Sequence, residues 1–554
     1  MKLTGSEIVM EVLLEQGVDT VFAYPGGTAL NIYDELYKYS DRIRHVLTAH
    51  EQGAAHAADG YARATGKTGV VMSTSGPGAT NLVTGIATAW MDSTPVVAIC
   101  SNVPDSLIGK DTFQEISIVG VTMPITKHNF FVNDIDELAD TLREAFQIAN
   151  SGRKGPVLVD ITKDVTAAVC EYQKKKPLPL RKPPVVPKQD VEEIANMINN
   201  CEKPVIYAGG GIVASGAWEE LLKLVKKADI PVVHTLMATG VIGKDKHNLG
   251  MIGMHGSVAA NRAVDQADLV IALGARFSDR VALNTEKFAR RARIVQVDID
   301  ISEINKNVLV DKAVTGDIKL FLKNLLPLVN KTVHNEWKDR VRGWKMKEHI
   351  AEMDPDASLK PSEIFEILND IGGKETIYAT DVGQHQMWAA QYLNHYQPRK
   401  FITSGGLGTM GFGYGAAIGA RIGCPHERVI HITSDGSFHM NMNECCTAVS
   451  NKLPIITVIL NNKVLGMVYQ WQTLFYGHRY AATTPERQTD YVKVAEGFGA
   501  KGFKAETPEE FREVLKKALR SKGPVWIDCR ISREEMVLPM IPGGKSVDDM
   551  ITMS

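Results

Sequence analysis

VIHITSDGS (residues 429–437) and IITVILNN (residues 455–462) are two short apolar runs, and each ends in polar, turn-forming residues. Such runs are typical of strands buried in a parallel sheet, because helices cover both faces of that kind of sheet. Asn462 follows Asp435 by 27 positions. Since both residues come directly after a predicted strand, the two turns can converge on one point.

The residues at these strand ends are candidate ligands for a hard metal ion. Asp435 offers a carboxylate, Asn462 offers an amide oxygen, and a backbone carbonyl can complete the set. Oxygen ligands of this kind suit Mg²⁺ that holds a diphosphate. The alternative is two ordinary turns, since Asp-Gly and Asn-Asn are common turn residues. The residues alone leave both interpretations open.

The strand pattern recurs along the chain and alternates with helices. Thr4 followed by Glu7 predicts a capping box at the start of a helix that Gly17 ends. A strand at 20–24 then leads into a turn that contains Gly26. A helix is predicted at 81–90, and further strands at 69–73, 96–100, 157–161, 204–208, 268–273, 294–297, 376–380 and 525–529. This alternation predicts an α/β fold of parallel, helix-covered sheets.

Changes in composition divide the chain into blocks. Five prolines and several basic residues in 171–190 predict a stiff linker, and the charged stretch 331–360 predicts a helical connector. The predicted domains are therefore 1–170, 191–330 and 361–554, the last of which includes a C-terminal tail. The first and third begin alike, with a helix, a strand and a glycine turn. This suggests two related sheets and a different middle domain.

Composition argues against several classes of function. The chain has 554 residues, 44% hydrophobic and 23% charged, as expected for a globular protein of several domains. Its 62 Lys and Arg against 64 Asp and Glu leave a net charge of -2, so no global field favours nucleic acid or a membrane. Seven cysteines without Cys-x-x-Cys spacing favour a reducing compartment. We see no targeting segment or membrane span, and expect a cytoplasmic protein with small-molecule partners.

The chain also resembles a known enzyme family. Asp435-Gly436-Ser437 followed by Asn461-Asn462 resembles the thiamine-diphosphate motif. NKVLGMVYQW at 462–471 resembles the catalytic subunit of acetolactate synthase (acetohydroxyacid synthase). The likeness covers nearly the whole chain, in order. The other matching segments are 24–27, 50–53, 74–81, 112–115, 126–129, 151–153, 253–256, 274–280 and 381–388.

This resemblance implies an N-terminal pyrimidine-binding domain, a central FAD-binding domain of Rossmann-like type and a C-terminal diphosphate-binding domain. The implied cofactors are thiamine diphosphate, Mg²⁺ and FAD. In that family each active site forms between two subunits, so the resemblance implies a homodimer or a tetramer built from such dimers. Family analogy adds a small regulatory subunit as an expected partner.

The resemblance implies catalytic roles for Glu51, Gln114 and Met410. Glu51 would hydrogen-bond N1′ of the aminopyrimidine and share a proton with it, while Met410 would prop the bent cofactor. From the residues alone, Glu51 is a solvated glutamate in the first turn of a helix, Met410 fills a core and Gln114 lies on the surface. These alternatives stay open at this point.

Most implied cofactor contacts lie in turns that follow strands. The positions implied for thiamine diphosphate are Gly26, Val382, Gly383, Gln384, His385, Gly408, Met410, Gly436, Ser437, Leu465, Gly466 and Met467. The implied metal ligands are Asp435, Asn462 and the backbone carbonyl of Val464. The positions implied for FAD are Arg153, Gly210, Gly211, Thr235, Leu236, Met237, Gly253, Met254, His255, Gly256, Gly274, Arg276, Asp298, Ile299 and Asp317. Glycines let backbone amides approach a diphosphate, although a glycine turn can also merely connect two elements.

Four positions are implied to contact the substrate: Phe113, Lys163, Arg276 and Trp471. A cation suits an acceptor carboxylate, and an aromatic wall at Trp471 can contact the additional methyl group of 2-oxobutyrate. From the residues alone, Phe113 would lie in a core and Arg276 in solvent.

The implied reaction decarboxylates pyruvate on thiamine diphosphate and ligates the hydroxyethyl carbanion to a second 2-oxo acid. Pyruvate as acceptor gives 2-acetolactate, and 2-oxobutyrate gives 2-aceto-2-hydroxybutyrate, in the first common step of branched-chain amino acid biosynthesis. Since no net electrons are transferred, FAD would be structural or vestigial. The alternatives are another thiamine-diphosphate-dependent 2-oxo acid decarboxylase or carboligase, and a catalytically silent relative.

Four positions depart from the family pattern. Ser434 stands where the family usually has Gly, Ser101-Asn102 where it has Gly-Gln, and Ser278 where it has Asp. Ser434 adds a hydroxyl beside the predicted metal site, and Asn102 shortens a side chain near the predicted cofactor pocket. We expect these changes to affect cofactor affinity and rate more than the identity of the reaction.

Overall fold

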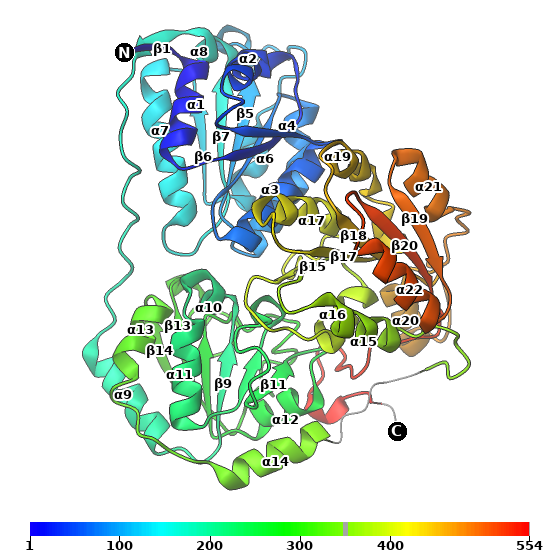
Figure 1. Ribbon diagram of the computed structural model, residues 1–554. Helices are drawn as coiled ribbons and strands as arrows, with labels where there is room; N and C mark the ends of the chain where they lie inside the picture. The colour runs from blue at the N-terminus through cyan, green and yellow to red at the C-terminus, as the bar shows by residue number, and fades with distance from the viewer. Residues whose placement is uncertain (347–352, 553–554) are drawn as a thin grey trace.

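The computed structural model describes residues 1–346 and 353–552, and this part of the chain contains three six-stranded parallel sheets (Figure 1). Helices cover each sheet, which confirms the predicted α/β class. A short antiparallel pair, β1 (Lys2–Thr4) and β8 (Val169–Glu171), joins the two ends of the first domain. No helix among the described residues has both the length and the apolar character needed to cross a membrane.

The first domain begins as predicted, because Thr4 and Glu7 form the capping box of α1. The strands of its sheet, in spatial order, are β3 (Arg44–Leu47), β2 (Thr20–Ala23), β4 (Gly69–Ser73), β5 (Val96–Asn102), β7 (Val157–Thr162) and β6 (His128–Val132). Its helices are α1 (Gly5–Glu15), α2 (Leu30–Lys38), α3 (Glu51–Thr65), α4 (Pro77–Asn81), α5 (Val83–Met91), α6 (Ile118–Thr122), α7 (Ile135–Asn150) and α8 (Lys163–Ala167). The helix predicted at 81–90 is therefore wrong at its start, because α4 and α5 are separate helices that meet at Leu82.

The central domain has a different strand order. In spatial order its strands are β11 (Asn248–Met251), β10 (Val232–His234), β9 (Pro204–Ala208), β12 (Leu269–Leu273), β13 (Arg293–Asp298) and β14 (Lys312–Thr315). Its helices are α9 (Lys188–Asn199), α10 (Gly210–Ser215), α11 (Trp218–Ala228), α12 (Val258–Gln266), α13 (Ile318–Leu325) and α14 (Asn335–Met346). Numbered along the chain, the order is 3-2-1-4-5-6, that of dinucleotide-binding folds, and it reverses between β9 and β12.

The third domain repeats the topology of the first. Its strands are β16 (Phe401–Ile402), β15 (Ile377–Thr380), β17 (Val429–Ser434), β18 (Ile455–Asn461), β20 (Val525–Arg530) and β19 (Lys501–Ala505). Its helices are α15 (Pro361–Gly372), α16 (Gln384–Tyr392), α17 (Phe412–Gly423), α18 (Asp435–Phe438), α19 (Cys445–Ser450), α20 (Gly466–Phe475), α21 (Tyr491–Phe498) and α22 (Pro508–Ala518). In both sheets the order along the chain is 2-1-3-4-6-5, so the internal similarity extends from two glycine turns to the whole sheet.

The two connecting segments differ from each other. Residues 172–187 contain no helix or strand and run along one side of the molecule to the central domain (Figure 1), as the prolines predict. The connector predicted to be helical over 331–360 is helical only in α14. Residues 353–360 form turns and bends, because Pro355 disfavours a helical conformation at Asp354, and residues 347–352 lie outside the described part.

Helices α3 and α17 join the first domain to the third (Figure 1). They approach closely at small residues. A Cβ on Gly60 would lie 2.2 Å from the carbonyl oxygen of Ala416, and one on Gly419 would lie 1.8 Å from that of Ala57. Buried residues of both domains, such as Tyr61 and Phe412, belong to one hydrophobic cluster. The buried contacts between α3 and α17 therefore fix the position of the first domain relative to the third within one chain.

Candidate functional site

The predicted strand ends meet around a hollow in the third domain. It holds about 440 Å³ of empty space, part of it open to solvent. It lies between the ends of β15 and β17, where the strand order reverses and where α/β sheets bind ligands. The lining residues are Val382, Gly383, Gln384, His385, Trp388, Met410, Ser434, Gly436, Leu460, Asn462, Leu465, Gly466, Met467 and Val468.

Most positions expected at thiamine diphosphate line this hollow, and three do not. Gly26 lies in the first domain, against Thr74. Ser437 is buried, and its hydroxyl accepts a hydrogen bond from the N–H of Gly411 (3.1 Å). Gly408 adjoins the hollow, because a Cβ there would lie 4.0 Å from Cγ1 of Val382.

Asp435 and Asn462 follow the ends of the neighbouring strands β17 and β18, and Asn462 lines the hollow. Asp435 is only 7% exposed, and its Oδ1 has no hydrogen-bond partner among the described residues. Burial raises the pKa of this carboxyl to about 6. The Oδ1 of Asn462 accepts from the N–H of Val464 (3.2 Å), which brings the expected ligands together.

This ligand set fits a cation that is shared with a diphosphate. The described residues contain no cluster of three His, Cys, Asp or Glu side chains that could hold a metal by themselves. Mg²⁺ is commonly held by one or two carboxylates together with phosphate oxygens. One unpartnered carboxylate beside neutral oxygens matches that pattern.

The backbone around the hollow is shaped for close approach by a ligand. Gly383 has φ +153°, and a Cβ there would lie 2.9 Å from the ring of His385. A Cβ on Gly436 would lie 2.7 Å from the side chain of Leu465. Both ring nitrogens of His385 are buried without partners, and burial lowers its pKa to about 4. The ring is therefore neutral near pH 7 and has one N–H to donate.

Glu51 lies in the first domain, at the start of α3. His50 caps this helix, since its Nδ1 accepts from the N–H of Gln52 (3.1 Å). Glu51 is buried, and Asn81 donates to its Oε2 (2.9 Å), so the interpretation as a solvated glutamate is wrong. Glu51 does not line the hollow.

A short loop places Phe113 and Gln114 at the surface of the first domain. The carboxylate of Glu115 accepts from the N–H groups of Gly109 (2.5 Å) and Thr112 (3.1 Å), which ties the loop together. Phe113 is 87% exposed, so the interpretation as a core residue is wrong. Gln114 is half-buried, and its Cβ packs against Gly76 in the turn after β4.

Known proteins match the chain over nearly its whole length. Residues 3–121, 191–325 and 381–529 match the thiamine pyrophosphate enzyme family as its N-terminal TPP binding domain, central domain and C-terminal TPP binding domain. A probable acetolactate synthase large subunit of Methanocaldococcus jannaschii is 47% identical, over 99% of this chain and 95% of its own. An acetolactate synthase of Mycobacterium leprae is 45% identical (99% and 90%), and an acetolactate synthase large subunit of Porphyra purpurea 42% (99% and 95%). The chain belongs to the acetolactate synthase large-subunit family. Its three sheets correspond to the three matched domains of thiamine pyrophosphate enzymes.

In this member of the acetolactate synthase large-subunit family, several of the expected flavin positions lie in the central domain, around the point where the strand order of its sheet reverses. Gly210 and Gly211 follow β9, and Gly274 follows β12. A Cβ on Gly211 would lie 2.7 Å from Cα of Gly274, whose φ is +61°. Only glycine fits such a close approach, and the N–H of Gly211 donates to the carbonyl of Gly274 (3.1 Å), so the two turns form a tightly packed glycine cradle.

Other expected flavin positions differ in what they contact. Thr235 Oγ1 and His255 Nδ1 are buried without partners among the described residues, and burial raises the pKa of Asp298 to about 6. These atoms fit a polar dinucleotide. Arg153 instead pairs with Glu303 (2.8 Å), and Asp317 caps α13. The remaining positions, in turns or at strand ends of the same domain, are Leu236, Met237, Gly253, Met254, Gly256, Arg276 and Ile299.

The expected substrate positions lie on different elements. Trp471, on α20, belongs to an apolar cluster with Met254, Met536 and Met540, so the C-terminal tail packs beside it. Lys163, at the start of α8, donates to the carbonyl of Gly27 (3.2 Å) in the first domain. Arg276 is half-buried in the central domain. The structure therefore brings Lys163 to the Gly26-Gly27 turn and places Trp471 further along α20, the helix whose first residues line the hollow.

The departures from the family pattern have local partners. The hydroxyl of Ser434 accepts from the N–H of Ser437 (3.4 Å) and caps α18. Asn102, at the end of β5, donates to Asp160 on β7 (2.7 Å) and does not line the hollow. The backbone carbonyl of Ser278 accepts from the N–H groups of the turn that follows it.

Sequence reasoning missed Glu444. Its buried carboxylate accepts from the N–H groups of Ala49 (3.2 Å) and His50 (3.0 Å), directly before Glu51. Burial raises its pKa to about 6. No local motif marks this residue, because its partners lie almost four hundred positions earlier.

Proposed function

We propose that the chain is the catalytic subunit of an acetolactate synthase, a transferase that uses thiamine diphosphate. It decarboxylates pyruvate and joins the two-carbon unit to a second pyruvate or to 2-oxobutyrate. The observation that carries the proposal is buried Asp435, whose Oδ1 has no hydrogen-bond partner among the described residues. Asp435 follows β17, where the strand order of the third sheet reverses, and the neighbouring strand β18 ends next to Asn462. Relatives that are 42–47% identical over 99% of the chain and are named acetolactate synthase support the same reaction.

Thiamine diphosphate, when bound, supplies the electron sink that decarboxylation of a 2-oxo acid requires. Asp435, Asn462 and the carbonyl of Val464 would hold Mg²⁺, and through it the diphosphate. His385 would donate its N–H to a phosphate oxygen, since burial keeps the ring neutral. Glu51 would hold a proton between its carboxylate and the aminopyrimidine, with Asn81 fixing the other oxygen.

The surroundings of Trp471 favour ligation over simple decarboxylation. A carboligase must keep protons away from the reacting carbon, because protonation releases acetaldehyde. Trp471 packs with Met536, Leu538 and Met540 of the C-terminal tail, so apolar side chains gather beside the start of α20. This apolar wall would exclude water and contact the methyl group that distinguishes 2-oxobutyrate.

A second chain would complete each site. Glu51 and Gln114 belong to the first domain, whereas the residues that line the hollow belong to the third. Tyr24, Leu30 and Phe113 are exposed apolar side chains around the turns that carry Gly26 and Gly76. An exposed apolar surface of this kind favours association with another copy. Sedimentation should give at least twice the 60.7 kDa chain mass, and a monomer at assay concentration would contradict the proposal.

The proposal also includes FAD as a cofactor, a regulatory subunit as a partner and the cytoplasm as the location. The cradle of Gly211 and Gly274 would hold the flavin diphosphate, while Asp298 would take a ribose hydroxyl. Relatives that are named large subunits support a small subunit as a partner. The seven unpaired cysteines suit a reducing compartment.

Product analysis tests the proposed reaction. The purified protein is incubated with pyruvate, thiamine diphosphate and Mg²⁺, with and without FAD, and acetolactate and acetaldehyde are both measured. Acetolactate as the main product is expected. Acetaldehyde alone would indicate a simple decarboxylase, and the absence of both would indicate a catalytically silent relative.

A further inference from the structure

We propose that Asp92 and Arg63 of the first domain are positioning residues for the loop that carries Met410 into the hollow. The inference rests on the proposed function, in which the hollow binds thiamine diphosphate. The loop spans residues 403–409, between β16 and the turn that starts α17. Met410 follows it directly and lines the hollow.

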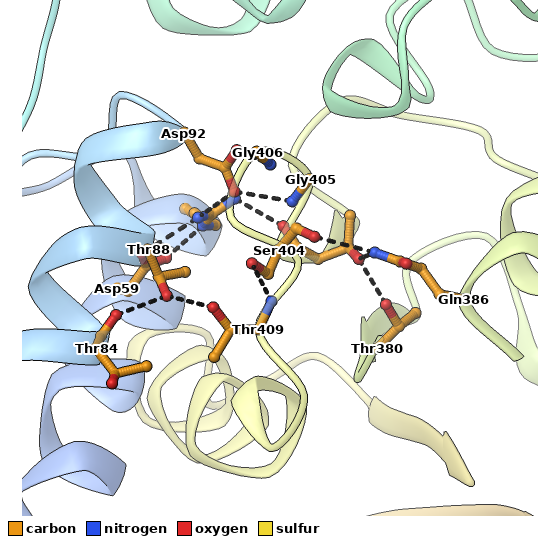
Figure 2. Close-up of polar contacts among 12 residues, drawn as sticks. Asp59, Thr84, Thr88, Asp92, Thr380, Gln386, Ser404, Gly405, Gly406 and Thr409 are labelled. Atoms are coloured by element: carbon orange, nitrogen blue, oxygen red, sulfur yellow. Dashed lines mark hydrogen bonds and ion pairs between the residues drawn. The ribbon is translucent and has the colours of Figure 1, made fainter. Parts of the chain in front are cut away.

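Asp92 holds the start of this loop through its backbone. Its carboxylate accepts from the N–H groups of Gly405 (3.0 Å) and Gly406 (2.7 Å), as Figure 2 shows. A Cβ on Gly406 would lie 2.9 Å from Oδ1 of Asp92 and 2.9 Å from Cβ of Met91. Glycine is therefore needed for the backbone to reach the carboxylate. Hydrogen bonds to an ionised acceptor in a buried place are among the strong ones in proteins.

Arg63 links Asp92 to the same loop. Its guanidinium donates to Asp92 (2.9 Å) and to the carbonyl of Thr403 (2.8 Å), and it also pairs with Asp59 on its own helix. The side chains of Asp59 and Asp92 are 0% exposed, and that of Arg63 is 10% exposed. Two carboxylates thus share one guanidinium, and the two glycine N–H groups provide the remaining hydrogen bonds that a buried carboxylate requires.

The same helix also holds the end of the loop. Thr88 lies one turn before Asp92, on α5, and its hydroxyl hydrogen-bonds that of Thr409 (2.7 Å; Figure 2). Inside the loop, the hydroxyl of Ser404 accepts from the N–H of Thr409 (3.0 Å). Helix α5 therefore holds both ends of the loop, and the residue after the second anchor is Met410.

The third domain also holds this segment, since Ser437 and Asn441 hydrogen-bond the backbone of Gly411 after Met410 (both 3.1 Å). Gln386 donates to the hydroxyl of Thr403 (2.7 Å) and to the carbonyl of Ser404 (3.1 Å), while the tip around Leu407 is exposed. The central domain touches the loop as well, because a Cβ on Gly405 would lie 2.4 Å from Sδ of Met237. All three domains meet at this loop, and the charged anchor among them comes from the first.

Asp92→Asn tests the proposal, with Glu15→Gln as a matched control. Glu15 forms another buried pair, with Arg143 (2.8 Å), and its contacts lie in the first domain and at the start of the segment that follows it, away from the hollow. Both variants remove one buried negative charge from an arginine pair. In Asp92→Asn, the Kd for thiamine diphosphate with Mg²⁺, measured by calorimetry, should rise about tenfold, and kcat at saturating cofactor should fall about tenfold. KM for pyruvate should change by less than about threefold, and the control should leave Kd and kcat within about twofold.

Thr88→Val is a second variant that tests the same proposal if Asp92→Asn does not fold. It keeps the shape of the side chain and removes the bond to Thr409 together with the bond to the carbonyl of Thr84 (2.9 Å) within α5. It should therefore weaken cofactor binding in the same direction and less strongly. If a folded variant keeps the Kd and kcat of the wild-type protein and loses only as much stability as the control does, the proposal is overturned. A wild-type protein that binds no thiamine diphosphate would instead contradict the proposed function.

Discussion

Replacing Asp435 with Asn should stabilise the protein without its cofactors and prevent it from binding them. Asp435 is buried, and one of its carboxylate oxygens has no hydrogen-bond partner in the described part of the chain. Burial raises its pKa from 3.8 to about 6. Asn has nearly the same shape and no charge, so the substitution removes the cost of burying a carboxylate.

The size of this effect follows from the pKa. At about 1.4 kcal/mol per unit, the rise from 3.8 to about 6 corresponds to roughly 3 kcal/mol of lost stability at neutral pH. For a domain of about 200 residues, each kcal/mol shifts the unfolding midpoint by about 2–4 °C. The Asp435→Asn protein without cofactors should therefore unfold several degrees above the wild type.

The pH dependence has a definite sign. Because the pKa is higher in the folded state, the folded protein binds the proton more tightly than the unfolded chain does. The loss of stability caused by burying the ionised Asp435 carboxylate is therefore complete above about pH 6 and disappears as the pH falls toward 3.8. The stability difference between the two proteins should therefore shrink across that interval.

Thermal unfolding with and without Mg²⁺ and thiamine diphosphate provides the assay. Binding should stabilise the wild type and not Asp435→Asn, so the order of the two midpoints should reverse. Glu15→Gln is a matched control, because Glu15 is also buried but pairs with Arg143 (2.8 Å), and despite its burial hydrogen bonds from Arg143 and Tyr172 hold the pKa of its carboxyl below the usual value. Its loss should destabilise the protein under both conditions. If Asp435→Asn is the less stable protein without cofactors, or gains as much from them as the wild type, our assignment of Asp435 is wrong.

The other predictions concern catalysis, selectivity and the flavin. Glu51→Gln should still bind thiamine diphosphate and lose at least about 100-fold in carboligation, and near-normal turnover would remove the proposed proton route. Trp471→Leu should lower the ratio of acetohydroxybutyrate to acetolactate when both acceptors compete, by at most about 1–3 kcal/mol in selectivity; an unchanged product ratio would discard that role. Gly274→Ala should purify with little FAD absorbance, since its Cβ would lie 2.6 Å from Cα of Gly211 and its φ is +61°; full flavin content would contradict the cradle.

The sequence predicted most interior strands of the three described sheets, because their apolar signal is local, but it missed their edge strands β3, β6, β11, β14, β16 and β19 and the short strand β10. Strands 69–73 and 204–208 have the predicted bounds, as expected for β-branched runs that end at glycine or polar residues. Helical stretches were less certain, since periodicity does not show where a helix breaks. Among its described residues the predicted connector is helical at 335–346 alone, and the helix expected from position 81 begins at 83.

The hollow was predictable to the extent that its residues follow strands. Gly383 and Asn462 sit in such turns, and a parallel sheet brings the turns together. Asp92 and Glu444 were missed, because the contacts that each makes with another domain lie more than three hundred positions away. Phe113 is exposed in a single chain, and neither its type nor its neighbours in sequence could show that.

Mixing two inactive variants tests most directly whether two chains enclose each cofactor. Glu51→Gln and Asp435→Asn should each be inactive alone. In a mixed dimer one site carries both substitutions, and the other has unchanged Glu51 from one chain and unchanged Asp435 from the other. Because about half of randomly paired dimers are mixed and each has one intact site, about a quarter of wild-type acetolactate formation should be restored. If co-expressed chains form mixed dimers and recover no activity, Glu51 and Asp435 do not come from different chains.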